Sequence, residues 1–280
     1  MVEIIKSFVR WVTRNLVVQG PIWAIWSSKL QESLYWKIQR NVVEERSFQS
    51  KVNSTFSRLE ILHGPFQGMV YPKAESCGSA LWPKLIGTYE RELQEGIEQL
   101  LNRSYQNIFD WGCAEGFYLV GLGMRNDKAQ LFGIEPEDRA RVLCQDLAKQ
   151  NRLASTRLQL LPSAKLADFS EQLSEPSLII SDCEGYEEEL FAEHLDLLHN
   201  SDLVIECHDH LIKGITDKLI LKFEPTHKVT VITSETRSSA DIPANIRTEI
   251  SKRFNSTEIT RLIDEGRPGT MKWIIAESRK

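Results

Sequence analysis

Small residues alternate with larger ones behind an acidic residue in the stretch "DWGCAEGF". The acid is Asp110, and the small residues are Gly112, Ala114 and Gly116. Small side chains let the main chain turn tightly and let a ligand lie against it. The pattern predicts that a helix begins at Phe117, and main-chain amides at a helix start favour a carboxylate or a phosphate. We therefore expect a ligand-binding loop at residues 110–117.

Two classes of ligand use a loop of this kind. A dinucleotide site needs G-x-G-x-x-G, and its third glycine would be Phe117, which is too large for close packing of helix on strand. A site for S-adenosylmethionine needs acid-x-G-x-G-x-G, which residues 110–116 match with one alanine. Glu135 and Pro136 follow the next apolar stretch, and a carboxylate there can accept strong hydrogen bonds from ribose hydroxyls. The sequence thus favours S-adenosylmethionine as cofactor, with its ammonium group near Asp110.

Titratable side chains gather in a second place, after two apolar stretches that end near residues 181 and 205. His208 is the candidate general base, since an ordinary histidine titrates at about pH 6.5. Glu206 could orient that histidine or bind substrate, and Asp182 could position the methionine end of the donor or an acceptor hydroxyl. The structural alternative is a tight turn and a solvated loop. The full set is Asp182, Glu184, Glu206, His208, Asp209 and His210.

The same side chains raise the question of a metal ion. Asp182, Glu206 and His208 could together hold Mg²⁺ or another hard ion. The sequence has no clear run of carboxylates at ligand spacing. Mg²⁺ is therefore compatible with these residues but not favoured, and we predict a site without a metal ligand.

The elements that would position these residues alternate between strands and helices from about residue 87 onward. This alternation predicts crossover connections and a mainly parallel α/β sheet with helices on both faces. Ligands bind beyond the carboxyl ends of such strands. We expect strands at 107–111, 129–135, 156–162, 177–182, 202–208, 227–235 and 270–278. We expect helices at 88–104, 117–126, 137–153, 186–200, 212–225 and 256–266, with a weak helix near 165–173.

The chain divides into three zones by composition. Residues 1–60 are helical in pattern and rich in tryptophan, residues 61–86 are rich in glycine and proline and predict a loop with at most short strands, and residues 87–280 carry the alternation. The aromatic side chains of the first zone could form a lid over the site, the face of a homodimer, or a helix pair on a membrane surface. These side chains are Trp11, Trp23, Trp26, Tyr35 and Trp36.

The composition excludes several classes of protein. The 280 residues carry a net charge of −5, which argues against a nucleic-acid partner bound through a general basic field. Charged residues interrupt every apolar run in the first 19 residues, so we expect no signal peptide and no spanning helix. Five scattered cysteines without a CxxC pair suit reduced thiols. We therefore expect a cytoplasmic protein that could touch a membrane only peripherally.

The stretch "LIISDCEGYEEELF" at 178–191 resembles the hallmark of the FkbM-type methyltransferases, an apolar strand followed by D-x-E-G-x-E. Asp182, Glu184, Gly185 and Glu187 occupy those positions, and "LVIECH" at 203–208 resembles the next strand of that family. Together with the loop at 110–116, these motifs make residues 87–280 similar to the class I S-adenosylmethionine-dependent methyltransferases.

This resemblance implies both a fold and an activity. The fold is a seven-stranded Rossmann-like sheet of order 3-2-1-4-5-7-6 with an antiparallel seventh strand. Ser163 and Ala164 would lie beside the adenine ring, where many members of the class carry an acid. The activity would be methyl transfer, most simply O-methylation of a hydroxyl on a small molecule or sugar, such as a secondary metabolite or a cell-surface glycan. N-methylation of a small molecule and a non-catalytic S-adenosylmethionine-binding partner subunit are the alternatives.

Overall fold

The computed structural model describes Ser33, Lys37 and residues 43–280. The tryptophan-rich helices predicted before residue 43 lie outside the described residues. Contacts divide the chain into two compact units, Met1–Ser57 and Arg58–Lys280. Residues 43–55 of the first unit are helical. The second unit contains the sheet, and it also includes the whole segment at 61–86 that the sequence analysis treats as a separate connection.

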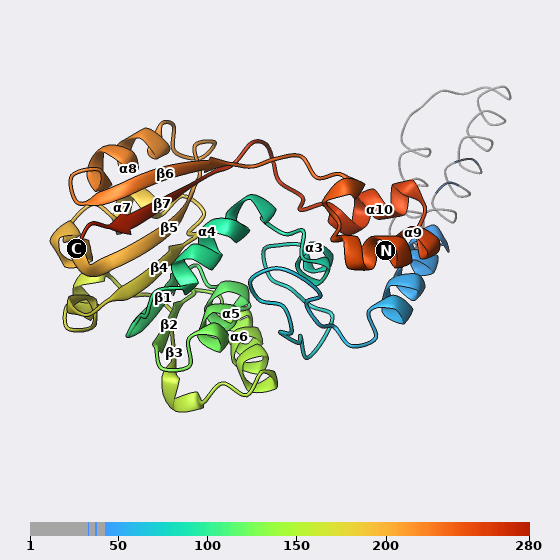
Figure 1. Ribbon diagram of the computed structural model, residues 1–280, viewed down its shortest axis with the longest axis horizontal. Coiled ribbons are helices and arrows are strands. Elements are labelled where there is room, and N and C mark those ends of the chain that lie inside the picture. The colour runs from blue at the N-terminus through green and yellow to red at the C-terminus, as the bar shows by residue number, and fades with distance from the viewer. Residues whose placement is uncertain (1–32, 34–36, 38–42) are drawn as a thin grey trace, which may run out of the picture. The chain divides into compact units, whose positions relative to one another are not determined.

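The second unit is built on one seven-stranded sheet of order β3-β2-β1-β4-β5-β7-β6, which confirms the predicted fold class (Figure 1). Strands β1 to β5 pair in parallel, whereas β7 pairs antiparallel with both β5 and β6. The strands are β1 (Asn107–Trp111), β2 (Gln130–Ile134), β3 (Leu158–Leu161), β4 (Ser177–Ser181), β5 (Ser201–Cys207), β6 (His227–Thr233) and β7 (Lys272–Ser278).

Helices lie on both faces of this sheet, with α4, α5 and α6 on one side and α7 and α8 on the other (Figure 1). Because β1 to β5 run parallel, the carboxyl ends of β1, β2, β4 and β5 lie at the same end of the sheet. The loops that carry the predicted site residues begin there. The helices are α3 (Leu81–Ile86), α4 (Arg91–Leu101), α5 (Phe117–Arg125), α6 (Asp138–Gln150), α7 (Glu187–Leu190), α8 (Ile215–Phe223), α9 (Ala244–Arg253) and α10 (Ser256–Ile263).

The apolar pattern of the strands explains the core. Every residue of β1, β4 and β5 is buried, as expected for central parallel strands covered on both faces. Phe109 of β1 stacks on Phe132 of β2 with 4.8 Å between the ring centroids, and Trp111 stacks on Phe109 at 5.5 Å. Helix α8 packs into the same core through Leu219 and Phe223.

No helix among the described residues is long and apolar enough to span a bilayer.

The structure corrects the sequence prediction in four places. The helix predicted at 186–200 is wrong: α7 has four residues, and a 3₁₀ helix (Leu195–Asn200) follows. His194 has a left-handed backbone (φ +60°) between them, which no continuous helix allows. The weak helix near 165–173 is two short 3₁₀ turns (Leu166–Phe169 and Gln172–Ser174). Helices α3 and α9 were not predicted, and α3 lies inside the segment predicted as loop.

Candidate active site

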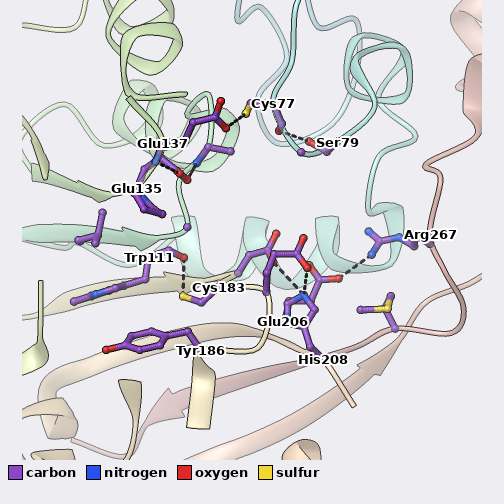
Figure 2. Close-up of a pocket in the computed structure, with 18 of the residues that line it drawn as sticks. Cys77, Ser79, Trp111, Glu135, Glu137, Cys183, Tyr186, Glu206, His208 and Arg267 are labelled. Carbon is purple, nitrogen blue, oxygen red and sulfur yellow. Dashed lines mark hydrogen bonds and ion pairs between the residues drawn. The ribbon is translucent and has the colours of Figure 1, made fainter. Parts of the chain in front are cut away.

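A cavity of about 670 Å³ opens at the carboxyl ends of the parallel strands. Its walls come from the loops after β1, β2, β3, β4 and β5, from the segment around Cys77 and Ser79, and from the loop that joins α10 to β7. The volume suits a small organic ligand. Figure 2 shows that Glu135 and Trp111 lie toward one end and that Glu206, His208 and Arg267 lie toward the other.

The loop after β1 brings main chain to the cavity, as its small residues predict. Gly112 has φ +82°, and a Cβ atom placed on it would lie 1.8 Å from the carbonyl oxygen of Asp182. Only glycine fits at this position, because both the backbone angle and the contact exclude a side chain. Ala114 also has a positive φ of +45°, so the one alanine in the motif occupies a position that favours glycine.

Glu135 closes the loop from the end of β2. One carboxylate oxygen accepts a hydrogen bond from the Ala114 amide at 3.0 Å, and the other accepts one from the Glu137 amide at 2.8 Å. A carboxylate has about four lone-pair positions, so both oxygens can still accept hydrogen bonds from a ligand. Glu135 therefore holds the loop and faces the cavity at the same time.

The predicted adenine end of the cavity is lined mainly by apolar residues. Pro136, Ser163 and Ala164 line it together with Trp111. The indole nitrogen of Trp111 donates a hydrogen bond to the Ala164 carbonyl at 3.2 Å, which ties the loop after β3 to the end of β1. The residues after β3 that line the cavity, Pro162, Ser163 and Ala164, include no acid, in line with the departure noted in the sequence.

Three of the predicted cofactor residues do not line the cavity. Asp110 is buried, and its carboxylate accepts a hydrogen bond from the Leu119 amide at 3.1 Å in the first turn of α5. Burial, followed by repulsion from Asp182, raises the pKa of Asp110 well above its ordinary value. Gly116 (φ +91°) and Phe117 form the start of α5. These residues shape the loop from behind, and their predicted contact with the cofactor stays a prediction.

A buried ion pair that the sequence analysis missed holds this loop from the other side. Lys84 Nζ of α3 lies 2.5 Å from Glu115 Oε1, and both side chains are at most 3% exposed. Glu115 also accepts hydrogen bonds from the Tyr71 hydroxyl at 3.1 Å, the Ser76 hydroxyl at 2.8 Å and the Cys77 amide at 3.0 Å. Nothing in the glycine- and proline-rich pattern of 61–86 indicates this contact, because it depends on α3.

His208 lies at the far end of the cavity and is buried. Its Nδ1 is 2.8 Å from Glu187 Oε1, and its Nε2 is 3.4 Å from Asp182 Oδ1 and 3.6 Å from Glu184 Oε2. Burial alone would lower the pKa of His208, but Glu187 and then Asp182 and Glu184 raise it above the ordinary value. The residue that orients His208 is thus Glu187, whereas the sequence analysis gave this role to Glu206.

Glu206 is held by a different partner. Its Oε1 pairs with Arg267 at 2.9 Å, and the same guanidinium pairs with Glu90 at 2.9 Å and with Glu265 at 2.8 Å. Burial, with repulsion from Asp182 and Glu90, raises the pKa of Glu206 to about 10. Burial and Glu90 also raise the pKa of Asp182, to about 6. This end of the cavity is therefore rich in carboxylates that share few cations.

The structure thus brings all three predicted catalytic residues, Asp182, Glu206 and His208, to one wall. It adds Glu187 and Arg267, which sequence reasoning missed. Glu187 stands in the D-x-E-G-x-E motif, so the sequence does mark this residue, but the motif alone does not indicate that it contacts His208. Arg267 comes from an irregular loop between α10 and β7 and has no such signal.

Asp182, Glu184 and His208 also form a group of possible metal ligands. One ligand atom from each lies within 4.8 Å of the others. The sequence analysis considered a metal held by Asp182, Glu206 and His208 and did not favour it. In the structure Glu206 is engaged with Arg267, and Glu184 takes its place beside Asp182 and His208.

Comparison with solved structures finds methyltransferases among the matches. A precorrin-6y C5,15-methyltransferase from Geobacter metallireducens is 11% identical and has a TM-score of 0.42, with 66% of this chain and 88% of that chain covered. A human methyltransferase 10 domain containing protein is 13% identical and has a TM-score of 0.43, with 68% and 82% covered. No protein-family model matches the sequence, and no curated protein matches it.

Proposed function

We propose that this protein is an S-adenosylmethionine-dependent methyltransferase that methylates a hydroxyl group of a small molecule or sugar. The observation that carries the proposal is one cavity with two different ends. Gly112, Ala114 and Glu135 form a main-chain and carboxylate cradle at one end, and His208 with its carboxylates forms a proton-accepting cluster at the other.

The residues at the first end fit the cofactor. Gly112 presents bare main chain, because a Cβ there would collide with Asp182. Glu135 keeps lone pairs for ribose hydroxyls, and Trp111, Pro136 and Ala164 line the cavity wall on the side proposed for adenine. The carboxylates beyond this wall suit a ligand that carries a positive sulfur and an ammonium group.

The second end supplies what transfer to a hydroxyl needs. S-adenosylmethionine carries its methyl group on a positively charged sulfur, so the acceptor oxygen forms a C–O bond while the S–CH₃ bond breaks and its electron pair stays on sulfur. The acceptor must also lose its proton. Asp182 and His208 line the cavity at this end, and Glu187 fixes the imidazole so that Nε2 faces Asp182 and Glu184. This cluster holds the acceptor hydroxyl and takes its proton.

The proposal includes the FkbM-type family, whose members the D-x-E-G-x-E motif resembles. Three residues of this motif contact His208: Asp182, Glu184 and Glu187. The motif would thus position the histidine that takes part in the proposed reaction. A secondary metabolite or a cell-surface glycan is the acceptor that this membership suggests. Transfer to an amine needs no strong base, so retention of most activity after His208→Ala would favour N-methylation over O-methylation.

The test is calorimetric titration with S-adenosylhomocysteine, the product form of the donor. We expect micromolar binding to the wild type and a loss of about tenfold to a hundredfold in Glu135→Ala, since a charge-assisted hydrogen bond contributes about 1.5–3 kcal/mol. Asp138→Ala is the matched control, because that carboxylate is 93% exposed and should leave affinity unchanged. Glu135→Gln keeps one acceptor oxygen. If thermal unfolding shows that this variant is as stable as the wild type, a loss of affinity reports the lost ligand contact and not an unfolded loop.

Absence of binding to the folded wild type would reject the donor site. Binding without any methyl transfer, across hydroxyl and amine acceptors, would instead favour the non-catalytic partner subunit.

A further inference from the structure

Three side chains surround a common point at the acceptor end of the cavity. The distances from His208 Nε2 are 3.4 Å to Asp182 Oδ1 and 3.6 Å to Glu184 Oε2. Both exceed the usual 2.7–3.2 Å of an N–H···O hydrogen bond, so the group does not close on itself. Ligand atoms at neighbouring corners of an octahedron with bonds of about 2.1–2.4 Å lie about 3.0–3.4 Å apart. The two distances at His208 Nε2 are close to this spacing, and all three ligand atoms lie within 4.8 Å of one another.

One buried atom of this group lacks a hydrogen-bond partner, and a second residue is held so that it faces the same point. Asp182 Oδ1 is buried and accepts no hydrogen bond. His208 is 2% exposed, and its hydrogen bond runs through Nδ1 to the fully buried Glu187 (Figure 2 labels His208 among the side chains that line the cavity). A carboxylate can only accept, so Nδ1 carries the hydrogen, and in the neutral form of the ring the Nε2 lone pair faces the cluster. Metal-binding histidines are fixed in the same way by a carboxylate behind the ring.

The third residue leaves the site open toward the cavity. The Glu184 side chain is 75% exposed and stands at the cavity wall. Three protein ligands on one side would leave the remaining coordination positions to water or to oxygens of a bound molecule. One imidazole and two carboxylates match a first-row divalent ion such as Mn²⁺ better than Ca²⁺, which prefers oxygen alone.

We propose that Asp182, Glu184 and His208 bind a divalent cation of the Mn²⁺ type, and that this ion holds the acceptor hydroxyl. A cation beside the hydroxyl oxygen would lower the pKa of that hydroxyl, so that its proton could leave to water. With the ion bound, the cluster would act through the cation and no longer as the free base described above. The use of the ion in acceptor binding depends on the proposed function, whereas binding of the ion itself does not.

The test is titration of the metal-free full-length protein with Mn²⁺ alone, followed by electron paramagnetic resonance. We expect saturable binding to one site, weakened at least about tenfold in Glu184→Gln. This variant should fold, since the side chain is exposed. Glu193→Gln is the matched control, because that carboxylate is 84% exposed, lies on the same connection and faces none of the three ligands.

Pulsed resonance on the bound Mn²⁺ should show coupling to the ¹⁴N nucleus of His208. Three results would each overturn the proposal: no binding at millimolar Mn²⁺, no nitrogen coupling, or equal affinity in Glu184→Gln and the wild type. Titration of the same samples with S-adenosylhomocysteine separates the two proposals. Mn²⁺ binding without donor binding keeps the cation site and rejects the donor site, and the reverse result rejects the cation site alone.

Discussion

The buried pair of Lys84 and Glu115 should decide whether the ligand-binding loop forms. Lys84→Met removes the cation but keeps an unbranched stem, which can still pack beside the Phe117 ring that now lies 4.9 Å from the ammonium nitrogen. Glu115 would then be a buried carboxylate with three neutral donors and no cation. Breaking a buried ion pair costs about 3–5 kcal/mol, and the remaining donors favour the lower end of that range.

A double-mutant cycle isolates the pair from the packing around it. Glu115→Gln should cost a comparable amount, because the buried Lys84 ammonium would keep neutral acceptors, the hydroxyls of Ser76 and Ser79 and the new amide oxygen, but no anion. The double variant should cost clearly less than the sum of the two single changes, since it leaves no unpaired charge. We expect a coupling energy of about 2 kcal/mol or more from denaturant unfolding of the three variants and the wild type.

The pH dependence of the same stability has a defined sign. Burial would raise the pKa of Glu115, but Lys84 and the hydrogen bonds to Cys77 and Ser76 outweigh it and lower that pKa below the ordinary value. The stabilisation from Glu115 is therefore complete above about pH 4.3, the unfolded-state pKa, and is lost as pH falls through the lower folded-state pKa. The stability difference between the wild type and Glu115→Gln should shrink over that acidic window.

The loss of the ion pair should also affect ligand binding by the loop at 110–117. Glu115 lies between Ala114 and Gly116, so Lys84→Met should also weaken S-adenosylhomocysteine binding. A cost below about 1 kcal/mol for Lys84→Met, with additive single changes, would refute the reasoning, because it would mean that the pair is solvated in solution.

Two further predictions concern positive backbone angles in the loop. Gly112→Ala should destabilise the protein by at least about 3 kcal/mol and abolish donor binding, because its Cβ would lie 1.8 Å from the Asp182 carbonyl oxygen. Gly214→Ala, at φ +76° with no atom within 4 Å, should cost only about 1–2 kcal/mol and leave donor binding intact, and equal effects of the two changes would contradict the contact argument. Ala114→Gly should raise stability by up to about 1 kcal/mol in urea unfolding, since relief of the left-handed alanine outweighs the extra entropy of the unfolded glycine, and a clear loss would contradict that balance.

The sheet could be predicted from the sequence because its signals are local. Residues 107–111 include three large apolar side chains that favour a strand, Ile108, Phe109 and Trp111, and the observed β1 has the predicted bounds. The closing pair β6 and β7 followed from the resemblance, which implies an antiparallel seventh strand. The helix predicted at 186–200 failed because Leu190, Phe191 and Leu198 reach the core without a continuous helix. Helical spacing of apolar residues cannot reveal a left-handed residue between them.

Only the site residues that stand directly after a strand could be predicted from the sequence. Glu135 and His208 stand next to apolar strands, so their place at the cavity followed from the order of elements. The ion pairs of Arg267 with Glu90 and Glu206 join residues 177 and 61 positions apart in sequence. Such long-range contacts depend on tertiary packing, and no local pattern records them.

The most direct measurement is a crystal structure of the wild-type protein with bound S-adenosylhomocysteine. The account predicts that its ribose hydroxyls contact Glu135, that its adenine lies beside Trp111 and Ala164, and that its sulfur faces the cluster around His208. A ligand bound elsewhere, or bound in this cavity with its sulfur turned away from Asp182 and His208, would contradict the claim that the cavity joins a methyl donor to a proton-accepting site.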